Sequence, residues 1–421
     1  MKTSPVVALQ HRNFRLLWSG QIVSMSGSMM QRAAILWHVS LLAPVDQKGL
    51  ALGLVGLAYV VPIVVFSLIS GVVADALDRR RVMLTTQISM AIVAALLAAI
   101  TLGGLAVAWP IYALAALSAA AGSFDGPARQ SLFPNLVPRE HLPNAISLNT
   151  IMFQAASVIG PALAGLIIAI GGVGWAYALN ALSFLAVIAA LLLMRDVPRH
   201  AGGGRRKISL RAALDGLRFV FEAPLIRSTM LLDFFATFFS SATALLPIFA
   251  QDILRVGAEG YGWLYAAPAI GAMLTSVALV RWVDRIDRRG PTLLWAVFGY
   301  GLATIVFGFS ETFWLTFACL ALTGATDTVS MVLRNIIRQL TTPDDLRGRM
   351  TGVNMVFFMG GPQLGELEAG LVAQAFGAPF AVVSGGLGCL IVTGWLALKT
   401  PALRRYRRDE ALPAAPGAVA D

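Results

Sequence analysis

The chain has 421 residues, of which 57% are hydrophobic and 13% are charged, and its mean hydropathy is +0.74. These values lie outside the range of soluble domains, so a soluble protein is excluded. A net charge of +10 would suggest nucleic-acid binding in a soluble protein. Here the basic residues flank apolar runs, where membrane topology and anionic lipid headgroups account for them, and nucleic acid is excluded as a partner.

Twelve apolar runs follow one another along the chain, each of about 20 residues or more, which is enough to cross a hydrocarbon core about 30 Å thick. The runs cover residues 14–41, 50–74, 82–108, 109–131, 144–171, 173–194, 224–251, 258–283, 291–309, 312–337, 347–375 and 378–398. All but three of the 32 Lys and Arg residues lie in one alternate set of connectors or at the ends of the runs that adjoin them, the exceptions being Arg32, Lys48 and Arg255. By the positive-inside rule, this asymmetry predicts an all-α membrane protein with twelve transmembrane helices and both termini in the cytoplasm.

The twelve runs fall into two sets of six. Residues 1–194 form the predicted N-terminal half and residues 224–398 the C-terminal half, joined by a cytoplasmic linker at 195–223. Residues 399–421 form a basic and then flexible cytoplasmic tail. The linker contains a triple glycine and many basic residues, and its second half has apolar residues at helical spacing. This pattern predicts an amphipathic helix, which lies either on the inner leaflet or in solvent as a connector.

Short motifs recur between the two halves. The segment Asp75–Arg81 after the second run recurs as Asp284–Gly290 after the eighth, and Gly160-Pro161 in the fifth run recurs as Gly361-Pro362 in the eleventh. These repeats predict two six-helix pseudo-repeats that arose by duplication. In transporters built this way, the substrate site lies between the halves near the bilayer midplane.

The segment Gly71–Arg81, which reads GVVADALDRRR, resembles the signature that the major facilitator superfamily carries after its second span. The segments 127–145 and 364–370 resemble the enterobactin-exporter-like branch of that superfamily, also described as transmembrane secretion effectors. The resemblance covers the whole chain. It implies a monomeric secondary exporter of small-molecule cargo in the cell (inner or plasma) membrane, in contact with membrane lipids. It also implies that the proton gradient supplies the energy and that no cofactor is needed.

In the superfamily, the network around the loop after the second span latches the outward-open state and breaks during the cycle. The resemblance assigns to this latch the residues Gly71, Asp75, Asp78, Arg79, Arg80 and Asp125. A carboxylate at this place can cap a neighbouring helix N-terminus, and an arginine can bridge to a second carboxylate. The alternative is that the arginines only fix the topology.

The fifth run contains Gly160, Pro161 and Gly165. Their spacing resembles the antiporter signature of proton-coupled exporters, although two of its glycines are alanines here. Small residues let helices approach closely and proline bends the span, so this segment can pack against the other half. Generic helix packing is the alternative explanation, because it requires the same residues.

Ionisable residues within the runs need a partner, a water-filled cavity or a function, because a charge at the bilayer centre costs about 2.5–3.5 kcal/mol on insertion scales. They are Arg32, Asp233, Asp327, Glu366 and Glu368. In the superfamily, spans 1, 4, 7 and 10 line the central cavity, which makes Arg32, Asp233 and Asp327 candidates for that cavity. Arg32 could instead form a structural ion pair, or hold an anionic substrate. The alternatives are a position near the cytoplasmic surface for Asp233 and a fixed pair with Arg334 for Asp327.

Asp233 is the first candidate for the proton carrier and Glu366 is the second. Asp233 is flanked by four phenylalanines, and an apolar cavity favours the neutral form of a carboxylate, which lets it load and release protons. Glu366 and Glu368 lie about 200° apart around a helix, so they cannot both face one site.

Aromatic residues on the predicted cavity helices, namely Trp37, Tyr112, Phe235 and Phe239, suggest a cavity for amphipathic cargo. The chain contains no metalloprotease, serine-hydrolase or nucleotide-binding motif, and its four histidines lie far apart. We therefore predict neither an enzyme nor a metal site. The predicted function is a proton-coupled exporter (antiporter) of small amphipathic molecules such as drugs or siderophore-like metabolites. The alternatives are a proton-coupled importer of a small polar solute and a non-transporting, lipid-handling membrane protein.

Overall fold

The computed structural model describes residues 6–104, 107–195, 218, 220–343 and 346–408. Within these ranges, the side chains of residues 67–69, 71–72, 74–76, 242, 347–349, 351–352 and 355–359 fall outside the description. The regular structure of the described residues consists of helices, with no strand among them, which confirms the all-α prediction.

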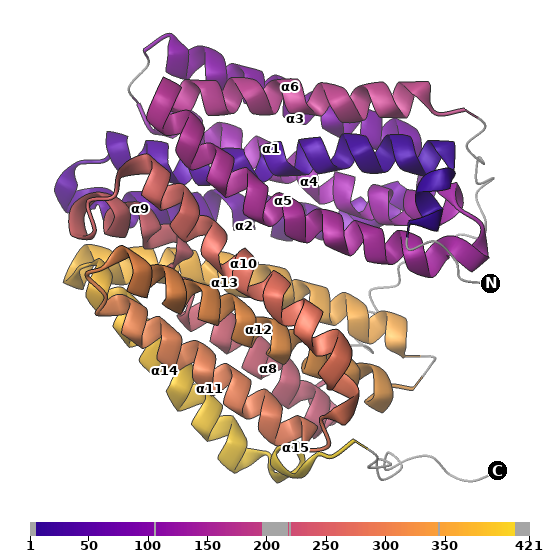
Figure 1. The fold of residues 1–421 in the computed structure, drawn as a ribbon, viewed down its shortest axis with the longest axis vertical. Helices are drawn as coiled ribbons and strands as arrows, with labels where there is room; N and C mark the ends of the chain where they lie inside the picture. The colour runs from indigo at the N-terminus through magenta and orange to yellow at the C-terminus, as the bar shows by residue number, and fades with distance from the viewer. Residues whose placement is uncertain (1–5, 105–106, 196–217, 219, 344–345, 409–421) are drawn as a thin grey trace.

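Figure 1 shows two helical bundles packed side by side. The N-terminal bundle comprises η1 (Val7–Gln10), α1 (Arg12–Leu42), η2 (Val45–Gln47), α2 (Lys48–Ala76), α3 (Arg79–Leu102), α4 (Trp109–Leu132), η3 (Phe133–Leu136), η4 (Arg139–His141), α5 (Leu142–Gly171) and α6 (Val173–Leu193). The C-terminal bundle comprises α8 (Pro224–Phe239), η5 (Ala242–Leu245), α9 (Leu246–Ile248), η6 (Phe249–Ile253), α10 (Gly257–Trp282), η7 (Val283–Arg285), α11 (Arg289–Gly308), α12 (Phe313–Thr341), α13 (Arg347–Phe376), α14 (Ala378–Lys399) and α15 (Pro401–Arg405).

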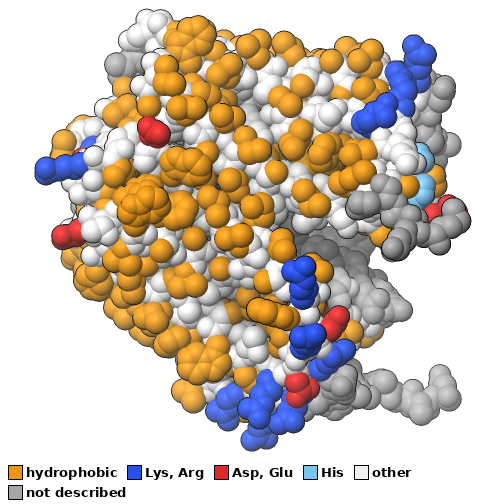
Figure 2. Space-filling view, viewed as in Figure 1, with side chains coloured by type: hydrophobic (Ala, Val, Ile, Leu, Met, Phe, Trp, Pro, Cys, Tyr) orange, Lys and Arg blue, Asp and Glu red, His pale blue; other side chains and the backbone are white. Residues whose placement is uncertain are grey.

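Nine helical segments among the described residues are long and apolar enough to cross a membrane. They belong to α2, α3, α5, α6, the stretch from α8 to η6, α10, α11, α12 and α14. The long helices α1, α4 and α13 are outside this set, so the count of twelve spans stays a prediction. Figure 2 shows hydrophobic side chains across the flank of both bundles, with Lys and Arg gathered toward the ends. This distribution is typical of a multi-pass membrane protein.

The seventh predicted span is broken. The sequence predicts one helix over 224–251, whereas α8 ends at Phe239 and the chain continues through short 3-10, α and π turns to Ile253. Pro247 has no N–H to donate to the preceding turn, and serine hydroxyls compete for backbone hydrogen bonds. Ser241 Oγ donates to the Thr237 carbonyl at 2.7 Å. Local backbone chemistry therefore overrides the uniform hydropathy of this span.

The two bundles meet closely through α2 with α13 and through α5 with α10. Both contacts depend on glycine. A Cβ on Gly53 would lie 3.1 Å from the Gly370 Cα, and a Cβ on Gly262 would lie 2.8 Å from the Gly165 Cα. Because the backbones approach so closely, van der Waals packing holds the bundles together at these crossings.

Polar contacts join the bundles at the end where α2 begins and α13 ends. Lys48 Nζ lies 2.9 Å from Asp252 Oδ2, and Gln251 donates to Ser40 Oγ at 2.7 Å. At the opposite end, Arg79 donates to the Ser131 carbonyl within its own bundle at 2.9 Å, and Figure 2 shows the bundles parting there. Among the described residues, the polar contacts between the bundles lie at one end, here called the closed end, and the recess lies at the other, here called the open end.

The first part of the predicted tail is packed against the C-terminal bundle. Leu403 and Tyr406 belong to a hydrophobic core shared with α11 and α14, and the Tyr406 carbonyl accepts from Gly290 N at 3.1 Å. The tail thus begins from a fixed anchor. Residues 409–421 lie outside the described residues, and so does the predicted linker helix except for its last turn, where Val220 packs against Ile226.

Replacing Tyr406 with alanine is expected to lower the free energy of unfolding by about 3 kcal/mol, because the ring is buried and its removal leaves a cavity. Thermal unfolding of the purified protein in detergent measures this change. Arg405→Ala, one residue away and exposed, is the matched control and should melt like the wild type. Equal melting temperatures for the two variants would contradict the anchoring role.

Candidate functional site

Asp125 of α4 is the centre of a polar network in the N-terminal bundle. Its Oδ1 accepts from Gln87 Nε2 at 2.9 Å and from Thr86 Oγ1 at 3.2 Å, both on α3. Its Oδ2 lies 4.0 Å from Arg129 Nε, and Arg129 Nη1 donates to Gln21 of α1 at 3.1 Å. The network therefore ties α1, α3 and α4 together inside one half.

A buried charge cluster occupies the C-terminal bundle. Arg334 Nη2 of α12 lies 2.9 Å from Asp233 Oδ1 of α8 and 3.4 Å from Asp327 Oδ1, two turns earlier on α12. The side chains of Asp233 and Arg334 are each 2% exposed, whereas that of Asp327 is 42% exposed. Asp233 is therefore buried within the bundle, and its depth in the membrane stays a prediction. The pair between Asp327 and Arg334, one of the two explanations offered for Asp327, is present.

The charges of this cluster do not balance when both carboxylates are ionised. Two aspartates then pair with one guanidinium, and a second buried arginine, Arg338 one turn along α12, interacts electrostatically with Asp233. Arg334 Nε and Nη1 are buried and make no hydrogen bond within the described part of the chain. Burying charges is costly unless they are paired, so this cluster is the place in the bundle where protonation changes the electrostatic energy most.

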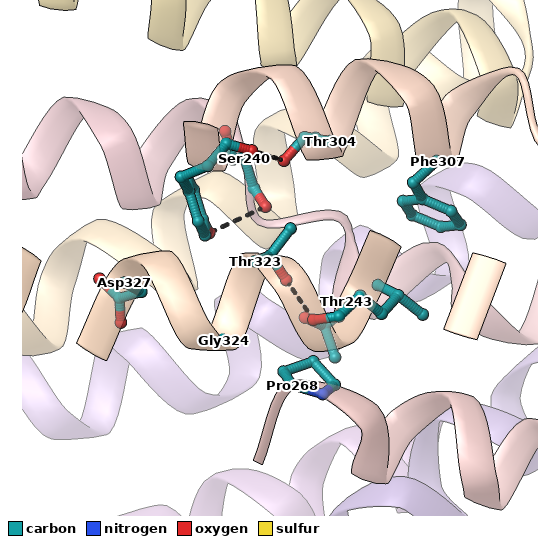
Figure 3. Close-up of a pocket in the computed structure, with 10 residues that line it drawn as sticks. Ser240, Thr243, Pro268, Thr304, Phe307, Thr323, Gly324 and Asp327 are labelled. Carbon is teal, nitrogen blue, oxygen red and sulfur yellow. Dashed lines mark hydrogen bonds between the residues drawn. The ribbon is translucent and has the colours of Figure 1, made fainter. Parts of the chain in front are cut away.

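Asp327 also lines a pocket of about 120 Å³ inside the C-terminal bundle (Figure 3). The other lining residues are Ser240, Thr243, Pro268, Tyr300, Thr304, Phe307, Leu320, Thr323 and Gly324. Five of these carry hydroxyl groups, and the buried Ser240 Oγ makes no hydrogen bond to the described residues. The pocket therefore places hydroxyl groups beside Asp327, whose carboxylate is more exposed than that of Asp233.

A third network joins the halves. Arg32 Nη2 of α1 donates to Glu366 Oε1 at 2.8 Å and to Gln363 Oε1 at 2.9 Å, both on α13. The Arg32 guanidinium lies over the ring of Tyr59 of α2, 4.7 Å from its centroid. Of the two alternatives for Arg32, the ion pair is present in this state. Glu368 is half-buried and is not in a described ion pair, consistent with its predicted place on another face of the helix.

The predicted aromatic cavity residues do not gather around one cavity. Trp37 is buried against Tyr261 of α10, with ring centroids 5.0 Å apart, and Tyr112 donates to the Ala51 carbonyl at 2.9 Å. Phe239 packs onto Gly388 of α14 within the C-terminal bundle, and Phe235 stacks on Phe239. In this state Trp37 is buried and Phe239 is half-buried between closely packed helices, and the assignment of these residues to a cargo cavity stays a prediction.

The loop of the predicted latch is only partly described. Asp78 caps α3, where its Oδ1 accepts from Arg80 N at 3.0 Å. Arg79 and Arg80 donate to the carbonyls of Ser131 and Leu192. The side chains of residues 71 and 75 fall outside the description. Asp125 pairs here with α3 and Arg129 rather than with Arg79, and the latch of the outward-open state stays a prediction.

The residues of the antiporter-like motif bring α5 close to two neighbours. A Cβ on Gly160 would lie 2.6 Å from Met29 Cβ of α1, and a Cβ on Gly165 would lie 2.9 Å from the Gly262 Cα of α10. The carbonyl of Pro161 faces the same Gly262. The motif thus serves packing both within a half and between the halves, and its specific link to export is untested.

A family model described as a transmembrane secretion effector matches residues 3–416, which is nearly the whole chain. The chain belongs to the transmembrane secretion effector family.

Curated relatives agree with this membership. Enterobactin exporter EntS of Escherichia coli O1:K1 / APEC is 28% identical over 405 residues, which cover 94% of each chain. EntS of Shigella boydii serotype 18 has the same identity and coverage. Since these relatives are transporters, this secretion effector is a membrane transporter and not an enzyme.

Solved structures show the same fold. A POT family transporter in complex with 5-aminolevulinic acid has a TM-score of 0.75 at 11% identity, with coverage of 93% of this chain and 96% of that one. A bacterial homologue of the human lysosomal transporter Spinster, in an inward-facing conformation, has a TM-score of 0.73 at 15% identity, with coverage of 94% and 98%. The secretion effector therefore has the major facilitator fold.

Several site residues were not predicted from the sequence. Arg334 was considered only as a structural partner, although it binds both aspartates of the cluster. Lys48 was noted only as an exception to the charge asymmetry, and its role in joining the halves through Asp252 was missed. Tyr59 and Gln363 carry no motif that would have marked them. The signal that the sequence offers for Lys48 is the scarcity of charged residues in its set of connectors. A basic residue that stands among so few charges is expected to form an ion pair.

Proposed function

We propose that this transporter is a proton-coupled exporter, an antiporter, of small amphipathic molecules such as drugs or siderophore-like metabolites. Its full-length similarity to proteins named enterobactin exporters supports export and a cargo of this size. The protein would lie in the inner or plasma membrane as a monomer, with both termini in the cytoplasm. That orientation rests on the distribution of Lys and Arg among the connectors.

The observation that carries proton coupling is the cluster of Asp233, Asp327 and Arg334. When one proton is bound, the cluster has one negative and one positive charge and is neutral. When the proton leaves, these three residues carry one net negative charge, which the buried Arg338, one turn along α12, offsets in part through its electrostatic interaction with Asp233. The two aspartates interact through the same Nη2 atom, so a change in the charge of one is felt by the other. Asp233, the more deeply buried, is the first candidate for the proton carrier.

Transport would proceed by alternating access. Cargo enters from the open end, which the charge asymmetry places in the cytoplasm, and the two halves rock about a site near the midplane. The closed contacts at Gly53 and Gly262 then separate, cargo leaves, and the protonated protein returns. At the glycine positions themselves the halves meet by close backbone packing. The neighbouring hydrogen bonds, from Leu50 N to Gln374 Oε1 and from the Tyr261 hydroxyl to the Ala33 carbonyl, must break when the halves part.

The test is proton movement in liposomes that contain the purified protein, an imposed pH gradient and a lumenal pH dye. The panel comprises lipophilic cations, macrolides, tetracyclines and catecholate siderophores. Cargo-dependent collapse of the gradient is expected for the wild type. If no compound of the panel causes the pH gradient to collapse, in protein shown to be folded, then drug and siderophore export is not the function.

Asp233→Asn is expected to abolish gradient-driven export while cargo binding stays detectable. The variant should fold, because Asp327 still balances the charge of Arg334. Glu311→Asn, a substitution in the exposed loop between α11 and α12, is the control and should transport normally. Full gradient-driven export by Asp233→Asn would contradict its role as the proton carrier.

A further inference from the structure

The ion pair of Arg32 and Glu366 lies where the closed contact between the halves ends. Along α2, Gly49 packs against Gln374, Gly53 against Gly370, and Gly56 against Gln363 and Glu366. These contacts run inward from the closed end, and the ion pair stands at their inner limit among the described residues. A cargo molecule that enters from the open end would meet this pair before the closed glycine contacts.

The pair is accessible and incompletely bonded. The Arg32 side chain is 25% exposed and the Glu366 side chain is 7% exposed. Glu366 Oε1 is bonded to Arg32, whereas its Oε2 is buried and makes no hydrogen bond to the described residues. A group with an N–H or O–H donor therefore reaches Oε2 only when the side chains of the pair move, because Oε2 is packed against Gly56 of α2.

Electrostatics makes this pair a barrier to opening. Separation of the halves at the closed end moves a guanidinium on α1 away from a carboxylate on α13. In a low-dielectric interior, breaking such a pair leaves uncompensated charges and is strongly unfavourable. The empty, deprotonated protein is therefore held in the state seen here. A proton on Glu366 removes its negative charge, and a bound donor group offers Glu366 another partner.

We propose that the Arg32–Glu366 pair is a binding site shared by proton and cargo, which lets the closed end open only when one of them is bound to Glu366. The inference rests on the proposed function and extends it. A protonated Glu366 no longer offers an anionic acceptor, so proton and cargo exclude each other. The empty protein cannot change state, and each opening of the closed end occurs with either a proton or a cargo molecule bound to Glu366.

The same geometry selects the cargo chemistry. A cation, or a neutral molecule with hydroxyl donors, binds the deprotonated Glu366 and competes with the proton. An anion would instead bind Arg32 and favour protonation of Glu366, so it would travel with the proton and could not be exported against it. Tyr59 offers an aromatic face beside the site, which suits a cation or a flat ring. The site therefore fits amphipathic cations and neutral hydroxylated aromatic molecules.

The ionisable groups that face Glu366 are of types that do not change protonation state in the pH range of the test. They are Arg32 from α1, Tyr59 from α2, and Tyr261 and Tyr265 from α10. Guanidinium and phenol groups ordinarily keep one protonation state between about pH 4 and about pH 9, whereas glutamates titrate within that range.

The test measures the distance between two spin labels across the closed end, without cargo, from about pH 9 to about pH 4. The labels replace Val45 of η2 and Glu311 of the loop between α11 and α12, which are both exposed. The buried Cys319 and Cys389 are replaced by alanine. The wild type is expected to be closed at high pH and to gain a longer distance as the pH falls. Glu366→Gln should show the longer distance at every pH, and Arg32→Gln should behave alike.

Glu368→Gln is the matched control, since it removes a carboxylate two residues away on another face of α13, and it should respond to pH like the wild type. A wild-type pH response in Glu366→Gln would overturn the proposal. At high pH, tetraphenylphosphonium should open the wild type and tetraphenylborate should not; opening by the anion alone would overturn the cargo assignment. A Glu366-dependent response in protein that moves no protons would leave the site standing and contradict proton-coupled export instead.

Discussion

Arg334→Met is expected to lower the free energy of unfolding by about 3–5 kcal/mol, which is the range measured when one partner of a buried ion pair is removed. The substitution leaves Asp233 without its counter-ion at 2% exposure, and methionine cannot donate a hydrogen bond to it. The fraction of folded protein after extraction and the melting temperature in detergent measure the loss. At the size of this effect, most of the variant is expected to aggregate during purification.

The added substitution Asp233→Asn should restore most of the lost stability, because it removes the carboxylate that Arg334→Met leaves without a counter-ion. Asp327→Asn in the same background should restore less, since the Asp327 side chain is 42% exposed and its charge is partly solvated. This order of rescue separates a charge effect from a packing effect. Failure of both substitutions to restore stability would show that the cluster is held by shape rather than by charge.

Gly262→Leu is expected to drive the protein out of the closed state and to stop transport. A Cβ at this position would lie 2.7 Å from the Pro161 carbonyl oxygen and 2.8 Å from the Gly165 Cα. Both atoms belong to backbone, so no side chain can move aside, and the halves must part at this end. The spin-label pair across the closed end should report the longer distance at all pH values.

Gly394→Leu provides the control for this prediction. Gly394 is exposed on α14, and nothing lies within 4 Å of a Cβ built there, so the added side chain meets lipid and should leave both the distance and transport unchanged. A closed distance distribution in Gly262→Leu would mean that the α5–α10 crossing does not hold the two halves in this state.

Much of the fold could be predicted from the sequence because hydropathy is a local property. Each apolar run needs only its own residues to become a helix that spans a bilayer, and the positions of most helices, α6 and α14 among them, agree with the runs. The exceptions are also local in origin. The third run was predicted to reach residue 108 but ends at Leu102, where Gly103 and Gly104 turn the chain, with Gly104 at a φ of 79°.

The sequence by itself determined the class of the protein, the helices and the short list of charged residues that need a partner. It also offered the pair of Asp327 and Arg334, since two turns of one helix bring them together. The tertiary structure alone decided that Asp233 shares this arginine, that Arg32 reaches Glu366 across 334 residues, and that Trp37 and Phe239 fill packed interfaces. The physical reason is that a partner on another helix depends on the rotation and register of both helices. These are set by close packing at glycines such as Gly53 and Gly370, far along the chain from the charges that they bring together.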